Sequence, residues 1–161
     1  MSDWSALGAA ILAEAGMTYN DVYELPYDQL YEGPRGICHP VNYRNPTSRK
    51  RPLIGLSGPV TTESMFAVLA HECGHVIHGH GYNSTPEYVE EAEAEQFAHQ
   101  AFHRILGRAP HDYIIRSGKK YVRTYCWARF RMLGPEPSKR WRREVVEWCG
   151  FDPGVSLAFD R

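Results

Sequence analysis

The strongest structural signal in this chain is the stretch TTESMFAVLAHECGHVIHG, residues 61–79. Thr61 or Thr62 can cap a helix there, and Glu63 suits the positive end of the helix dipole. A glycine at position 79 or 81 can end that helix. Apolar residues recur between these ends at helical spacing: Phe66, Leu69, Cys73, Val76 and Ile77. The pattern predicts one amphipathic helix whose apolar face is buried.

The residues at the start of the chain also favour helices. A first amphipathic helix is expected to begin near Ser2 or Asp3 and to end at Gly16. Its apolar run, residues 6–13, is far shorter than the roughly 20 residues of a membrane-spanning helix. Residues 19–31 are rich in Tyr, Asp and Glu, and we interpret them as a short second helix.

Two short strands are expected between these helices and residue 61. They cover residues 36–43 and 52–56, and a polar turn at residues 45–48 can join them into a hairpin. Pro40 cannot donate a ladder hydrogen bond, so it confines the first strand to a sheet edge. The apolar face of such a hairpin needs a covering helix.

Three further helices are predicted after residue 84. The first begins near Thr85 and Pro86, ends at Gly107, and carries one apolar stripe. The stripe comprises Ala94, Phe97, Ala98, Ala101, Phe102 and Ile105. The others are expected at about residues 119–133 and 139–149, separated by a segment with Gly and Pro.

The length and cysteine pattern favour one domain in a reducing compartment. A chain of 161 residues suits a single domain, with a core at about residues 17–106 and a helical extension at about 108–161. The four cysteines are widely spaced and form no C-x-x-C pair. Without a basic, apolar secretion signal, we expect a cytoplasmic protein with no membrane partner.

The motif HECGH at residues 71–75 carries the chemistry of the predicted central helix. Residues four apart share a helix face, so His71 and His75 can bind one Zn²⁺ through their imidazoles. Glu72 projects about 100° away and can serve as general base toward a water. The alternative is a chance match, with two histidines on a solvated helix face.

A catalytic zinc needs a third protein ligand and one open position. His78, His80 or a carboxylate of the next helix can supply it, but His78 lies in one row with the first two histidines. With Phe97 marking the buried side of that next helix, Glu90 and Glu93 fall near it. On the same wheel Glu91 and Glu95 point away, and Glu87 lies in the first turn of the helix. This geometry leaves Glu90 and Glu93 both open.

The runs LAHECGHVI at residues 69–77 and EAEQFA at residues 93–98 resemble the ImmA/IrrE-type zinc metallopeptidases. The segment PLIGL at residues 52–56 is similar to the edge strand that precedes their metal helix. The resemblance implies that Glu93 is the third zinc ligand, beside His71 and His75. It covers about residues 35–106, and Glu95 stands where the family usually has Asn or Asp.

Zinc with these ligands predicts peptide hydrolysis. Zn²⁺ lowers the pKa of a bound water to about 7, and Glu72 can accept its proton and pass it to the leaving amine. Tyr82, Tyr88 and His78 are the candidates for stabilising the oxyanion. His99 and His103 repeat the four-residue spacing without a suitably placed glutamate, so we interpret them as surface residues.

The charges divide the chain into an acidic and a basic part. Residues 1–103 carry a net charge of −8, and residues 104–161 carry +7. Basic residues alternate with aromatic residues between positions 119 and 143, a pattern that can bind nucleic acid. The simpler interpretation is that the aromatic side chains are core and the charges a solvated face.

Together these observations predict an α+β, zincin-like domain in which a small β-sheet packs on the helix with the HExxH motif, followed by extra C-terminal helices. We expect a cytoplasmic zinc metalloprotease, a hydrolase that cleaves a specific intracellular protein or peptide. The resemblance implies that the substrate is a DNA-bound transcriptional regulator, and the basic helices can contact nucleic acid near it. The alternative is a non-catalytic DNA- or protein-binding module with a structural or vestigial zinc site.

Overall fold

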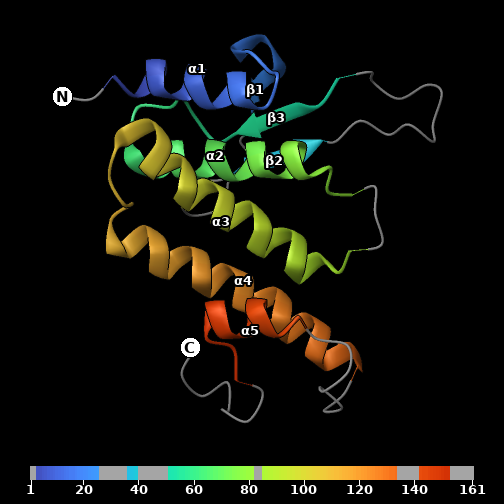
Figure 1. Ribbon diagram of the computed structural model, residues 1–161. Helices are drawn as coiled ribbons and strands as arrows, with labels where there is room; N and C mark the ends of the chain where they lie inside the picture. Colours follow the sequence, from blue (N-terminus) through green and yellow to red (C-terminus); the bar gives the residue numbers. More distant parts are fainter. Residues whose placement is uncertain (1–2, 26–35, 40–50, 82–84, 134–141, 153–161) are drawn as a thin grey trace.

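The computed structural model describes residues 3–25, 36–39, 51–81, 85–133 and 142–152. It is a mixed α+β structure with a small three-stranded sheet and five helices in the described part of the chain. The sheet and α1 (Trp4–Glu14) lie on one side of α2 (Glu63–His78), and the remaining helices follow on the other side (Figure 1). The predicted α+β class is confirmed.

The sheet has the order β1-β3-β2. The predicted pairing of two strands is confirmed, because β2 (Gly36–His39) runs antiparallel to β3 (Leu53–Leu56). The strand β2 lies at the sheet edge, as the prediction had it, but β3 is central rather than an edge strand. The predicted turn at residues 45–48 lies outside the described residues.

The third strand, β1 (Val22–Glu24), occupies part of the segment 19–31 in which a short helix was expected. Only Tyr19–Asp21 form a short 3₁₀ helix, capped by the side chain of Thr18. The chain then pairs in parallel with β3, a contact with residues some 30 positions away. Residues 26–31 of the predicted helix lie outside the described part of the chain.

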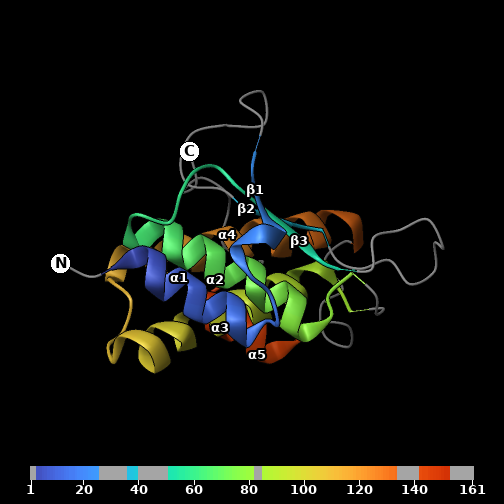
Figure 2. The same cartoon turned by 90° about the horizontal axis from the view of Figure 1, so that it is seen from above.

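The two first α-helices begin where the sequence predicted. Asp3 Oδ1 accepts a hydrogen bond from the backbone of Ala6 at the start of α1. Thr62 Oγ1 accepts one from Met65 at the start of α2. Gly79 ends α2 in the left-handed conformation, with φ of 66°. Seen from above, α1 and α2 run side by side (Figure 2).

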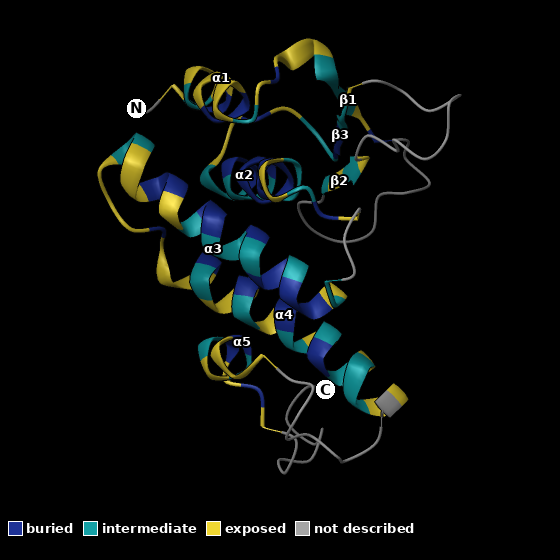
Figure 3. Ribbon diagram, turned by 45° about the vertical axis from the view of Figure 1, so that its right-hand side comes forward, coloured by how far each residue is buried: buried dark blue, intermediate teal, exposed yellow. Residues whose placement is uncertain are grey.

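The long helix α3 (Glu87–Leu106) lies between α2 and α4 (Asp112–Leu133) (Figure 3). One side of α3 contributes Phe97, Ala98 and Phe102 to a core shared with α1, α2 and the sheet. Another side contributes to a second core shared with α4 and α5 (Arg143–Cys149). The first core also includes Ile11 of α1 and Ile114 of α4.

The helix α4 begins seven residues before the predicted start at 119. Its aromatic side chains Tyr125, Trp127 and Phe130 pack against the second core, and the rings of Trp127 and Phe151 are 5.0 Å apart. This packing agrees with the interpretation of these aromatic residues as core. All four cysteines are free thiols. None of the described helices combines the length and the apolarity needed to cross a membrane.

Candidate metal centre

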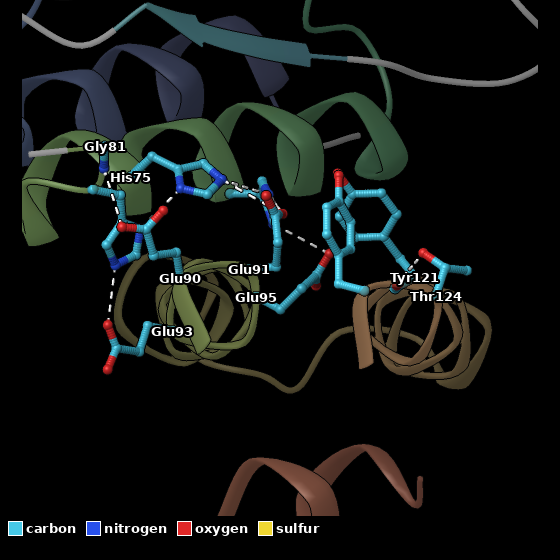
Figure 4. A network of polar contacts seen from close by, with 11 residues as sticks. His75, Gly81, Glu90, Glu91, Glu93, Glu95, Tyr121 and Thr124 are labelled. Carbon is cyan, nitrogen blue, oxygen red and sulfur yellow. Dashed lines mark hydrogen bonds and ion pairs between the residues drawn. The ribbon is translucent and has the colours of Figure 1, made fainter. Parts of the chain in front are cut away.

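Two histidines of α2 and one glutamate of α3 bring three ligand-type atoms close together. The Nε2 atoms of His71 and His75 are 3.0 Å apart. Glu91 Oε2 lies 3.2 Å from the Nε2 of His71 and 3.6 Å from that of His75. In Figure 4, Glu91 points from α3 toward His75 on α2. This group can hold a metal ion.

The spacing of these three atoms fits a tetrahedral metal site. Bonds of about 2.0–2.1 Å place neighbouring tetrahedral ligand atoms roughly 3.3–3.4 Å apart. The three observed separations of 3.0, 3.2 and 3.6 Å lie on both sides of that value. Among the described residues, no fourth histidine, cysteine or acid joins the group. The described residues therefore supply three corners of a tetrahedron.

The electrostatics of the group favour a positive charge among the three atoms. Glu91 Oε2 is buried and makes no hydrogen bond within the described structure. Burial alone would lower the pKa of His71, but close contacts with Glu91 and Glu95 raise it to about 10. Burial would raise the pKa of Glu91, yet His71 and His75 lower it to about 2. A proton or a metal ion can supply the charge that balances Glu91.

The third member of the predicted site, Glu93, lies apart from the two histidines in the structure. Glu93, expected beside His71 and His75, instead contacts His80, and Glu91 takes the expected place. The helical wheel misplaced these acids because Phe97 was its only buried reference. Since α3 packs against helices on two sides, the side chain of Glu91 is only 11% exposed, whereas that of Glu93 is 37% exposed.

Glu72 is buried beside the candidate metal centre, where the prediction placed the general base. The backbone N–H of Cys38 on β2 donates a hydrogen bond to it. Burial raises the pKa of Glu72 above its ordinary value, and the nearby His71 and His75 partly offset the rise. A carboxylate with a raised pKa is suited to accept a proton near neutral pH.

Glu95 lies behind His71, on the side away from Glu91. Its Oε1 is 3.2 Å from His71 Nδ1, and its Oε2 is 3.6 Å from His99 Nε2. The prediction that His99 is a surface residue was wrong, because its side chain is 16% exposed, while His103 is exposed as expected. A carboxylate in this position can hold the imidazole of His71 in one orientation.

A second histidine and acid group lies at the end of α2. His78, His80 and Glu93 bring ligand-type atoms within 4.8 Å of one another, so this group can also hold a metal ion. His80 is 3% exposed and His78 is exposed at the surface. The rings of these two histidines stack with their centroids 5.3 Å apart.

Of the three candidates for stabilising an oxyanion, none is placed at the centre by the described structure. Tyr82 lies outside the described residues. The hydroxyl of Tyr88 is buried in the second core, where it accepts a hydrogen bond from the Arg142 backbone. His78 stacks on His80. A residue that the sequence reasoning missed, Tyr121 of α4, has its ring 5.8 Å from that of His71.

Tyr121 also lines both pockets that border the candidate centre. One pocket of about 280 Å³ lies beside His75, His80 and Glu91, and the other of about 660 Å³ lies toward α4. The two share four lining residues: Gly36, His71, Glu72 and Tyr121. The centre therefore lies at the junction of the two pockets. The sequence signal for Tyr121 was only its place among the alternating basic and aromatic residues.

Comparisons of the chain with protein-family models, with curated proteins and with solved structures found no match. The interpretation of the site therefore depends on its own residues: two imidazoles and a carboxylate that converge, a second carboxylate beside them, and a groove that reaches all four. These residues are His71, His75, Glu91 and Glu72.

Proposed function

We propose that this protein is a zinc-dependent endopeptidase that cleaves a protein or peptide. The observation that carries the proposal is the convergence of His71, His75 and Glu91 beside the buried Glu72. Two imidazoles, one carboxylate and an open fourth corner form a typical catalytic zinc set, whereas structural zinc sites have four protein ligands. The zincin-like architecture and the resemblance to ImmA/IrrE-type peptidases belong to this proposal.

His71, His75 and Glu91 would hold the ion, and Glu72 would lie next to it without binding it. When bound, Zn²⁺ supplies a Lewis acid that lowers the pKa of water and polarises a carbonyl. Glu72 accepts a proton from the attacking water, because burial has raised the pKa of its carboxyl group. It then donates that proton to the amine that leaves.

The groove supplies the place for the substrate. The two pockets meet at His71 and Glu72, so an extended peptide that spans both would present a bond to the centre. The hydroxyl of Tyr121 lies 2.9 Å from that of Tyr125, and burial raises the pKa of Tyr121, which keeps it a neutral donor. We assign to Tyr121 a contact with the carbonyl region of the substrate.

An intracellular regulator that binds DNA remains the proposed substrate, on the strength of the family resemblance alone. The basic residues of α4 would then bring the enzyme near the nucleic acid that carries its target. The competing function is a binding module whose zinc site is structural or vestigial. The two functions differ in whether Glu72 is needed, and this decides the experiment.

The test compares Glu72→Gln with wild type and with Glu87→Gln, an exposed acid of α3. Each zinc-loaded protein is incubated with a denatured protein mixture, and mass spectrometry counts new peptide termini. We expect Glu72→Gln to bind one equivalent of zinc and to lose cleavage by at least about 100-fold, while Glu87→Gln cleaves as wild type does. Undiminished cleavage by Glu72→Gln, or none by wild type with a full complement of zinc, would contradict the peptidase assignment.

The ligand assignment has its own test in the metal content. We expect His71→Ala and Glu91→Gln to lose stoichiometric zinc by elemental analysis, and Glu87→Gln to keep it. Glu93→Gln is expected to keep one equivalent at saturating zinc, because Glu93 contacts His80 and not the ion. Full zinc in Glu91→Gln with loss in Glu93→Gln would restore the assignment made from the sequence.

A further inference from the structure

His80 and Glu93 continue the polar contacts of His75 on the side away from the candidate metal centre. The Nε2 atom of His75 faces His71 and Glu91, and its Nδ1 atom lies 2.8 Å from His80 Nδ1. The Nε2 atom of His80 in turn lies 3.0 Å from Glu93 Oε2. A continuous chain of polar contacts therefore runs from Glu93 through His80 to the metal-facing ring (Figure 4).

The end of α2 places His80 in this chain. Gly79 adopts the left-handed conformation, and the backbone N–H of His80 donates to the carbonyl of His75 over 3.0 Å. This bond from the second residue past the helix end is the Schellman pattern. It returns the chain under the last turn, so His80 is 3% exposed although it lies beyond the helix. Backbone and ring contacts thus connect the same two residues.

Hydrogen-bond direction along this chain is decided at its acidic end. An ionised carboxylate can only accept, so His80 Nε2 must carry the hydrogen that faces Glu93. A neutral imidazole with hydrogen on Nε2 has its lone pair on Nδ1, which then accepts from His75 Nδ1. His75 with hydrogen on Nδ1 has its own lone pair on Nε2. That is the nitrogen that faces the candidate centre.

We propose that His80 and Glu93 are positioning residues that hold His75 in the tautomer able to bind the metal ion. The proposal rests on the proposed zinc function and adds the means by which one ligand is oriented. Histidines that bind metals commonly donate their other ring N–H to such a partner, and loss of the partner costs about 10–100-fold in metal affinity. Glu93 thus acts on the ion indirectly, through His80 and then His75.

With this direction of hydrogen bonding, the group of His71, His75 and Glu91 and the group of His78, His80 and Glu93 cannot both bind a metal ion. A metal ion on His80 Nε2 would require hydrogen on His80 Nδ1, because only one of the two facing Nδ1 atoms can donate. His75 Nδ1 would then accept, and hydrogen on its Nε2 would block the first centre. The group of His78, His80 and Glu93 is therefore a support for the first site and not an independent second site.

The first test measures zinc affinity by competition with a chromophoric chelator. We expect wild type to bind one equivalent and His80→Phe to bind it about 10–100-fold more weakly. His80→Asn keeps an acceptor near the position of Nδ1, and we expect it to recover most of the loss. His78→Ala is the control, because it removes the ring that stacks on His80 but leaves the hydrogen bonds among His75, His80 and Glu93 in place, and its affinity should stay close to that of wild type.

Two results of this titration would overturn the proposal. One is equal zinc affinity in wild type and His80→Phe. The other is that wild type binds two equivalents of zinc, while His80→Phe and His78→Ala each bind one equivalent with the affinity of wild type. The second result would assign an independent metal site to His78, His80 and Glu93.

The second test is independent of zinc and of cleavage. The ring nitrogen shifts of the metal-free wild type, measured by ¹⁵N NMR, report which nitrogen of each histidine carries hydrogen. We expect hydrogen on Nδ1 of His75 and on Nε2 of His80; the reverse tautomers would overturn the proposal. A wild type that binds no zinc would refute the proposed function. The nitrogen shifts would still show whether His80 and Glu93 fix the tautomer of His75.

Discussion

Glu91 and Glu72 lie beside the same pair of histidines, but their pKa values are shifted in opposite directions. Contacts with His71 and His75 lower the pKa of Glu91 to about 2, although burial opposes the change. Burial raises the pKa of Glu72, although a backbone hydrogen bond from Cys38 opposes the rise. Neighbouring carboxyls with separated pKa values are typical of sites that divide charge stabilisation from proton transfer. Here Glu91 is suited to bind a cation and Glu72 to carry a proton.

The raised pKa of His71 predicts how the stability of the metal-free protein depends on pH. Its value of about 10, against 6.5 in an unfolded chain, means that protonated His71 stabilises the fold fully below pH 6.5. This contribution is lost as pH rises from 6.5 toward 10. We expect urea unfolding of the chelator-treated protein to show a loss on the order of 1–2 kcal/mol between pH 6 and 8.5.

The acid side of this profile has the opposite sign. Glu91 has a pKa of about 2, against 4.5 in the unfolded chain, so its contribution to stability is present above pH 4.5 and is lost as pH falls toward 2.

The control for the alkaline side is His71→Phe, in which the loss of unfolding free energy above pH 6.5 should disappear. An equal loss in both proteins would show that another group is responsible.

Gly36 predicts a second effect at the level of one residue. A Cβ atom at this position of β2 would lie 2.5 Å from Glu72 Oε1 and 2.6 Å from its Cγ. The substitution Gly36→Ala must therefore displace the side chains of Glu72 and of Val68, whose Cγ1 would lie 2.8 Å from the added Cβ; none of the three ligand residues is among these contacts. We expect cleavage to fall on the order of 100-fold with unchanged zinc affinity. A parallel loss of zinc would show that the strand also supports the metal ligands.

At the scale of elements, the close approach of α2 and α3 sets the geometry of the site. Gly74 lies between the two histidines in the sequence, and its missing side chain lets the backbone of Ala94 approach it. A Cβ on Gly74 would lie 2.9 Å from Ala94 Cα and 3.1 Å from the Ala94 carbonyl oxygen. Backbone atoms cannot move aside as a flexible side chain can. The distance from Glu91 to the histidines therefore depends on this glycine.

The substitution Gly74→Ala tests this contact. Alanine is more favourable than glycine in a helix by about 1 kcal/mol. If there were room for a side chain at position 74, the substitution would therefore stabilise the protein. We expect instead a loss of about 1–3 kcal/mol in the free energy of unfolding and weaker zinc binding, because the helices must separate. Gly58→Ala is the control, since nothing lies within 4 Å of its added Cβ and its stability should hardly change. A more stable Gly74→Ala protein would contradict the close approach.

At the scale of the whole molecule, the candidate centre connects α2 with α3, the helix that belongs to both cores. His71 and His75 come from the helix next to the sheet, and Glu91 comes from α3, whose other side packs on α4 and α5. An ion bound there would hold together elements that otherwise meet through side-chain packing. Zinc should therefore stabilise the entire fold and not one segment.

Removal of zinc is expected to lower the melting temperature of the whole protein. A ligand that binds only the folded state, at about 1,000 times its Kd, contributes roughly 4 kcal/mol. For a chain of this size that corresponds to a melting temperature shift on the order of 10 °C, measurable by calorimetry. His71→Ala should not respond to zinc, and Mg²⁺ should not replace it. A zinc response that persists in His71→Ala would place the ion elsewhere.

Local patterns were sufficient for the elements whose signals lie within a few residues. Thr62 and Gly79 bound α2 as capping rules predict, and the histidines meet because a four-residue spacing on a helix brings them to one face. The paired strands β2 and β3 followed from composition and turn residues. These features depend on the conformation of short segments, which neighbouring residues largely determine.

Contacts between distant segments account for what sequence reasoning misplaced. The strand β1 pairs its backbone with β3, and α4 includes Gly118, where an added side chain would collide with the carboxylate of Glu95 on α3. Glu91 faces the histidines because α3 is buried on two sides, which a wheel centred on Phe97 could not represent. Spacing along one helix was enough to bring His71 and His75 together, whereas the partner acid depended on how a second helix is rotated between its neighbours, and packing from both sides sets that rotation.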